Sequence, residues 1–136
     1  MSNAETKSVL VVDDDAQVLE STCSLLGGMG FRALACRESR FALEMLGANT
    51  VDVVLSDIRM PGLTGLELLD RIRAGFPDLP VVLMTAFAEV DLAMGALSNG
   101  AFDFILKPYK PDVAATVARA ALCRDCGKSE SRKNEQ

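Results

Sequence analysis

The chain has 136 residues, a formal net charge of −5 and an apolar fraction of 49%. This length and apolar fraction suit one compact domain that buries a core without disulfides, and a second folded module has no room. The acidic balance argues against direct contact with nucleic acid, and no apolar run approaches a membrane span. We therefore expect a cytoplasmic protein with no nucleic-acid or membrane partner.

The two ends of the chain differ in composition from its middle. Residues 1–6 are expected to be disordered, and Ser-Asn-Ala at positions 2–4 looks like a cloning remnant. Residues 124–136 are polar and without periodicity, which predicts a tail or the start of a linker. The folded domain is therefore expected over residues 7–123.

Five short apolar runs indicate strands that are buried on both faces. They lie at residues 8–12, 31–36, 51–56, 79–85 and 102–106. Between the first four runs, apolar residues recur with helical spacing at 18–26, 41–46 and 66–72, and two further helices are expected at about 89–98 and 112–122. Strands that alternate with helices predict an α/β fold with a parallel sheet.

Glycines and capping residues mark where these helices end and begin. Gly27, Gly30, Gly75 and Gly100 each precede a strand, while Thr64 and Asp112 are expected N-caps. Gly95 lies inside the fourth helix, which it weakens by roughly 1 kcal/mol relative to Ala. Close packing against a neighbour is the alternative reason for this glycine.

Polar residues follow four of the five predicted strands. Asp13, Asp14 and Asp15 follow the first, Asp57 the third, Thr85 closes the fourth, and Lys107 follows the fifth. In a parallel α/β sheet these strand ends meet at one edge, where ligands bind. Clustered carboxylates repel one another unless a cation lies among them, and oxygen ligands in a chain without histidine favour Mg²⁺ over zinc. An ionised aspartate beside Mg²⁺, a hydroxyl and an ammonium group suits phosphoryl transfer.

Each of these features has an ordinary explanation when it is taken alone. Asp15 could cap the first helix while its neighbours are solvated, Thr85 could bond locally, and Lys107 could be a surface lysine. Their coincidence at one edge of the sheet favours a site. We expect Cys123 and Cys126, which form a Cys-x-x-Cys pair, to be free thiols. A metal or redox role is the alternative.

Four motifs resemble, in content and in order, those of the receiver domains of two-component response regulators. They are Val-Leu-Val-Val-Asp-Asp-Asp at 9–15, Asp-Ile-Arg-Met-Pro-Gly at 57–62 with Gly65, Met-Thr-Ala at 84–86, and Gly-Ala-Phe-Asp-Phe-Ile-Leu-Lys-Pro-Tyr at 100–109. The resemblance implies a single doubly wound (βα)5 domain of the flavodoxin-like type with strand order 2-1-3-4-5. It also implies a Lys107–Pro108 peptide bond that can be cis.

The resemblance also implies a role for each residue that matches the family's motifs. Asp57 is similar to the phosphoacceptor, Asp14 to a direct Mg²⁺ ligand and Asp13 to the acid that orients metal-bound water, while the backbone carbonyl of Arg59 would complete the ligand set. Lys107 and Thr85 resemble the pair that holds the phosphoryl oxygens. Phe104 is similar to the aromatic switch residue, which here works by packing because it lacks a hydroxyl. Arg59 and Phe87 would flank the path of an attacking water.

The expected function is a signalling switch that catalyses only its own phosphorylation and dephosphorylation. The phosphoryl group would come, with Mg²⁺, from a sensor histidine kinase or a phosphotransfer protein. The face made by the fourth helix, fifth strand and fifth helix would then bind an output domain, a partner, or a second copy in a phosphorylation-dependent homodimer. Two alternatives stay open: a receiver-like binding module that is never phosphorylated, and a Mg²⁺-dependent aspartyl phosphatase, which would need an acid where Arg59 stands.

Overall fold

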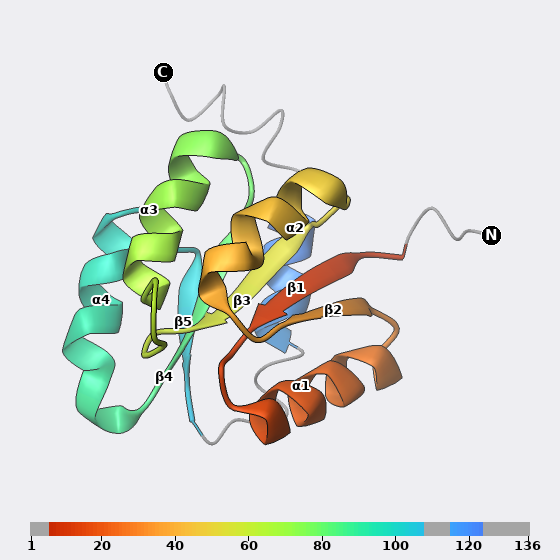
Figure 1. The fold of residues 1–136 in the computed structure, drawn as a ribbon, viewed down its shortest axis with the longest axis horizontal. Helices are drawn as coiled ribbons and strands as arrows, with labels where there is room; N and C mark the ends of the chain where they lie inside the picture. Colours follow the sequence, from red (N-terminus) through yellow and green to blue (C-terminus); the bar gives the residue numbers. More distant parts are fainter. Residues whose placement is uncertain (1–5, 108–114, 124–136) are drawn as a thin grey trace.

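A five-stranded parallel sheet forms the centre of the molecule (Figure 1). The computed structural model describes residues 6–107 and 115–123, apart from the side chain of Phe87. The strand order is β2-β1-β3-β4-β5, which confirms the expected doubly wound, flavodoxin-like topology. The strands are β1 (Ser8–Val12), β2 (Arg32–Cys36), β3 (Val53–Asp57), β4 (Val81–Thr85) and β5 (Asp103–Leu106).

Helices cover both faces of the sheet and enclose two apolar layers. They are α1 (Ala16–Gly28), α2 (Ala42–Ala48), α3 (Gly65–Gly75), α4 (Val90–Ser98) and a helix over residues 115–123, with short 3-10 turns η2 (Ser39–Phe41) and η3 (Phe87–Glu89). One layer joins α2, α3 and α4 to Leu10, Val54 and Leu83, and the other joins α1 and the 115–123 helix to Val9, Leu55 and Met84. Neighbouring residues of one strand therefore enter opposite cores, which explains why the strands are apolar without alternation.

Local hydrogen bonds start the helices beside the carboxyl edge of the sheet. Asp15 caps α1, because its side chain accepts from the backbone N–H groups of Gln17 and Val18. Thr64 and Glu67 form a capping box at the start of α3, which confirms the predicted N-cap. The second predicted N-cap, Asp112, lies outside the described residues, as do Pro108, Cys126, residues 1–5 and the tail from 124.

Several expected boundaries were wrong by one or two residues. β3 starts at Val53 and β4 at Val81, two residues later than expected, and Asp57 is the last residue of β3 instead of the first after it. The late start of β4 has a local cause, because Pro80 has no backbone N–H to donate to the ladder. Phe41 was expected at the start of the helical segment 41–46, but it closes η2, and its relative exposure is 47%. Within the described ranges, no helix has both the length and the apolar character needed to cross a membrane.

The fourth helix begins one residue later than expected, after the η3 turn. A side chain built at Gly95 would meet nothing within 4 Å, so the alternative of close packing at this glycine is wrong. Gly95 instead lines an open groove of about 260 Å³ between α3 and α4.

Candidate functional site

Three carboxylates meet at the carboxyl edge of the sheet. Asp13 and Asp14 follow β1 directly, and Asp57 ends β3, the strand beside it. One ligand atom from each of the three lies within 4.8 Å of the others. Asp15, the third acid of the run, is turned to capping α1. The structure therefore brings together the acids predicted to hold the metal, and it separates Asp15 from them.

Asp13 is completely buried, and one of its carboxylate oxygens is unsatisfied. Its Oδ1 atom accepts the backbone N–H of Asp15 at 2.9 Å, whereas Oδ2 has no hydrogen-bond partner in the described part of the chain. The Lys107 ammonium lies 3.6 Å from Oδ2, which is too long for a hydrogen bond and acts through charge alone. Burial raises the pKa of Asp13, and the neighbouring carboxylates of Asp57 and Asp14 add to this. A hard cation fits here, since it would satisfy the orphaned oxygen and remove the repulsion.

Asp57 is held in place from two sides. Its Oδ1 atom accepts the backbone N–H of Ile58 at 2.8 Å, and its Oδ2 atom lies 3.1 Å from the Lys107 ammonium. The backbone N–H of Lys107 donates to the carbonyl of Thr85 at 2.9 Å, so the end of β5 is fixed to the end of β4. Oδ2 is therefore the oxygen that faces the ammonium group, which also lies beside Asp13.

The start of α3 lies directly against the backbone of Asp57. Gly65 donates its N–H to the carbonyl of Ile58 at 2.8 Å. A methyl group at position 65 would overlap the carbonyl oxygen of Asp57 and lie 2.9 Å from the Ile58 Cα atom. Gly62, in the intervening loop, has a φ of 83°, which favours glycine. These two glycines let the β3–α3 loop fold tightly beside the carboxylate.

Comparison with known proteins identifies the family. The family model of the response regulator receiver domain matches residues 9–119. The chain belongs to this family. It is 41% identical over 114 residues to the DNA-binding transcriptional regulator NtrC of Escherichia coli. The aligned segment covers 84% of this chain and 24% of that protein. The chain is 42% identical over 125 residues to the response regulator protein FleR of Pseudomonas aeruginosa, covering 90% of this chain and 26% of that protein.

Solved receiver domains have the same fold. A response regulator receiver domain protein from Clostridium thermocellum superposes with a TM-score of 0.84 at 28% identity, covering 88% of this chain and 98% of that one. The receiver domain of NtrX from Brucella abortus gives a TM-score of 0.78 at 34% identity, with 84% and 97% covered. The chain spans about a quarter of the length of the curated relatives it matches. Membership of this family favours the predicted receiver function over the phosphatase alternative.

The two predicted switch residues of this receiver domain lie on neighbouring strands. The Thr85 side chain is buried, and its hydroxyl donates to the carbonyl of Ala86 at 3.1 Å instead of pointing to an oxygen of Asp57. Phe104 is half-buried and packs against the core layer below α4. Phe87 and Arg59 were expected beside the path of an attacking water. The side chain of Phe87 is not among those that the structure describes, and the side chain of Arg59 forms an ion pair with Glu89.

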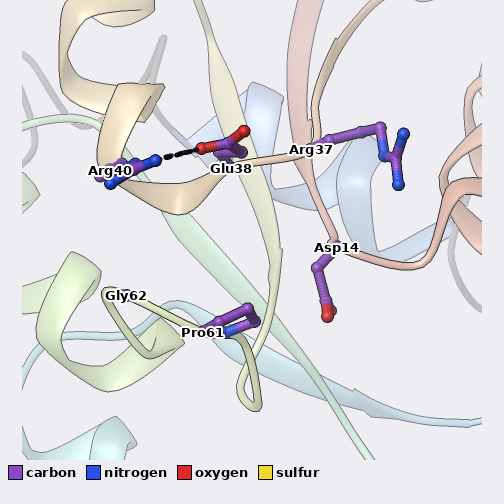
Figure 2. A pocket seen from close by; sticks show the side chains of 6 residues that line it. All are labelled: Asp14, Arg37, Glu38, Arg40, Pro61 and Gly62. Carbon is purple, nitrogen blue, oxygen red and sulfur yellow. Dashed lines mark hydrogen bonds and ion pairs between the residues drawn. The ribbon is translucent and has the colours of Figure 1, made fainter.

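Beside the acids, the receiver domain has a hollow of about 590 Å³ (Figure 2). Asp14 borders it on one side and Pro61 and Gly62 on another, while Glu38 and Arg40 pair with each other across its upper rim. Arg37 also lines it. Sequence analysis had not pointed to these residues of the β2–α2 connection.

Ser39, in the same connection, was also missed. Its buried hydroxyl accepts the N–H of Leu63 at 3.1 Å, and it lies 2.6 Å from the carbonyl of that residue. This contact holds the β3–α3 loop against η2. A single serine between charged residues carries no recognisable signal in the sequence, because its role depends on a loop 24 residues away.

Proposed function

We propose that this receiver domain accepts a phosphoryl group on Asp57 and thereby switches a partner-binding surface. The observation that carries the proposal is the position of one ammonium group between two acids. Lys107 Nζ lies 3.1 Å from Asp57 Oδ2 and 3.6 Å from Asp13 Oδ2, in a cluster of three carboxylates. Burying the Asp13 carboxylate beside that of Asp57 is unfavourable, and such arrangements are concentrated at functional sites. Here Asp57 offers a nucleophile and Lys107 a counter-charge.

The chain's own groups supply most of what the transfer needs. Asp57 Oδ2 attacks the phosphorus of a phosphohistidine, the P–O bond forms as the P–N bond breaks, and the imidazole nitrogen keeps the electron pair. The Ile58 N–H fixes the orientation of the carboxylate, and Lys107 neutralises charge on the phosphoryl oxygens. Asp14, Asp57 and the carbonyl of Arg59 would hold Mg²⁺, with Asp13 orienting its water, and the ion's charge would offset that of the phosphoryl group.

The positions of Thr85 and Phe104 support the proposed switch. The Thr85 hydroxyl would leave the carbonyl of Ala86 to donate to a phosphoryl oxygen, and Phe104 would move into the space that it vacates. The face of α4, β5 and the 115–123 helix would change with it. Exposed apolar side chains are present on these elements: Met94 and Leu97 on α4, and Leu106 on β5. Such a patch is typical of a surface that binds a partner.

The partners are inferred from the family. The donor would be a sensor histidine kinase or a phosphotransfer protein in the cytoplasm. The matched relatives are about four times as long as the aligned segment, and NtrC is described as a DNA-binding transcriptional regulator. We infer that the α4–β5 face acts on an output domain of such a protein, or on a second receiver in a phosphorylation-dependent dimer.

The direct test is the intact mass of the protein after incubation with acetyl phosphate and Mg²⁺. We expect one phosphoryl adduct, and we expect it to disappear in Asp57→Asn and after chelation of the metal. An adduct that persists in Asp57→Asn would refute the assignment of the phosphoacceptor.

A second measurement separates this proposal from a receiver that only binds a partner. A titration with Mg²⁺, followed by beryllofluoride, should saturate in the wild type and weaken in Asp14→Asn, because a degenerate site lacks the full ligand set. A folded wild-type protein that binds neither the ion nor beryllofluoride would support the binding module instead.

A further inference from the structure

An ion pair joins the loop after β3 to the turn before α4. Arg59 lies two residues beyond Asp57, and its Nε atom is 3.0 Å from Oε2 of Glu89. Glu89 closes the η3 turn and directly precedes α4. The pair therefore connects the loop that carries the phosphoacceptor to the helix that carries the exposed apolar patch.

The two partners differ sharply in burial. The Arg59 side chain is 74% exposed, whereas that of Glu89 is only 17% exposed, and its Oε1 atom is buried without a hydrogen-bond partner in the described part of the chain. A buried carboxylate oxygen that lacks a partner is unfavourable. The free energy gained from the ion pair is therefore largely offset by the cost of burying this oxygen. The pair between Arg40 and Glu38 is different, because both of its side chains are more than half exposed.

The η3 turn also shares an acceptor with the switch residue. The carbonyl of Ala86 accepts the hydroxyl of Thr85 at 3.1 Å and the backbone N–H of Glu89 at 2.9 Å. When the Thr85 hydroxyl turns towards a phosphoryl group, one of the two bonds to this carbonyl is lost. The movement of Thr85 therefore acts directly on the carbonyl that accepts the Glu89 N–H and forms the η3 turn.

We propose that the Arg59–Glu89 ion pair is a latch, which holds η3 and the start of α4 in the unphosphorylated arrangement and opens when Thr85 turns towards Asp57. The latch rests on the proposed phosphorylation of Asp57, and it makes Glu89 a positioning residue that sets how easily the domain switches. A nearly balanced contact suits this role, since a small local change then shifts the population of two arrangements.

The test uses paired variants of the latch. Glu89→Gln and Arg59→Gln each break the ion pair, and Arg40→Gln breaks the exposed pair as the matched control. Amide hydrogen exchange is measured over residues 86–97 in the protein without metal or phosphodonor. We expect exchange to be about fivefold faster in both latch variants and in the double variant, and unchanged in the control.

The two single variants separate the latch from a simple effect of charge. Glu89→Gln removes a negative charge and Arg59→Gln a positive one, so a long-range electrostatic effect would act in opposite directions. A latch predicts faster exchange in both, with no further increase in the double variant because the second change breaks nothing new. Unchanged exchange in both variants would show an ordinary surface pair, and opposite changes would show an electrostatic effect; either overturns the latch.

Beryllofluoride binding in the presence of Mg²⁺ then connects the latch to the switch. Glu89→Gln should bind it about fivefold more tightly than the wild type, because less free energy is needed to reach the phosphorylated-like arrangement. Weaker or equal binding would refute the latch while leaving the proposed function intact. A wild type that binds no beryllofluoride at all would refute the proposed function, and the latch with it.

Discussion

A single methyl group at position 65 should disturb both the fold and the acid cluster. Gly65 is the first residue of α3, and its Cα faces the backbone of the last residue of β3. A Cβ atom there would overlap the carbonyl oxygen of Asp57 and lie 3.1 Å from the carbonyl carbon of the same residue. Neither atom belongs to a flexible side chain, so the end of β3 and the start of α3 must separate.

Gly95 provides the matched control, because it lies inside α4 with nothing within 4 Å of its Cβ position. Gly95→Ala should stabilise the protein by about 0.5–1 kcal/mol, through helix propensity alone. Gly65→Ala should destabilise it by about 1–3 kcal/mol, as expected for overpacking against rigid backbone. At about 4 °C per kcal/mol for a domain of this size, the melting temperatures of the two variants should differ by about 10 °C.

Thermal unfolding followed by circular dichroism measures this difference, and Mg²⁺ titration measures its effect on the site. We expect Gly65→Ala to bind Mg²⁺ more weakly, because the displaced strand end carries Asp57, and Gly95→Ala to bind it like the wild type. If Gly65→Ala melts above the wild type and binds Mg²⁺ normally, α3 does not lie against the Asp57 backbone.

Four further substitutions and one pH series test other parts of the molecule. In the metal-free protein, Asp13→Asn should raise the free energy of unfolding by about 1–3 kcal/mol, because it removes a buried charge of which one oxygen has no hydrogen-bond partner. Denaturant titration in EDTA measures this free energy. A variant less stable than the wild type would contradict the prediction. Because burial raises the pKa of Asp13, its folded form binds the proton more tightly than the unfolded chain. In EDTA, the wild type should therefore lose stability relative to Asp13→Asn as pH rises above about 4. Thr64→Ala should cost about 1 kcal/mol through loss of the capping box, with Glu67→Ala costing a similar amount, and an unchanged melting temperature would argue against the cap. Ser39→Ala should leave the fold intact but speed amide exchange at Leu63, whose N–H donates to the serine hydroxyl, and unchanged exchange there would show that Ser39 does not hold the loop.

Local patterns in the sequence were sufficient to predict the order of the strands and main helices and the edge where the acids meet. Continuous apolar runs indicated buried parallel strands, and the polar residues that follow them indicated the site, because parallel strands end at a common edge. Thr64 was recognisable as a cap, since a capping box is formed by residues three apart. The strand order was implied by resemblance to the family, and it is confirmed in the structure.

The tertiary structure decided how far each of the three adjacent acids is buried and what it contacts. Asp13, Asp14 and Asp15 are chemically identical and consecutive, yet one is buried beside Asp57, one is exposed and one caps a helix. Their difference depends on the direction in which the chain leaves β1, and on Lys107 arriving from β5. The exposure of Phe41, the anchoring of a loop by Ser39 and the pairing of Arg59 with Glu89 have the same origin. Periodicity and motif spacing are properties of neighbouring residues, whereas burial and pairing depend on which distant elements pack together.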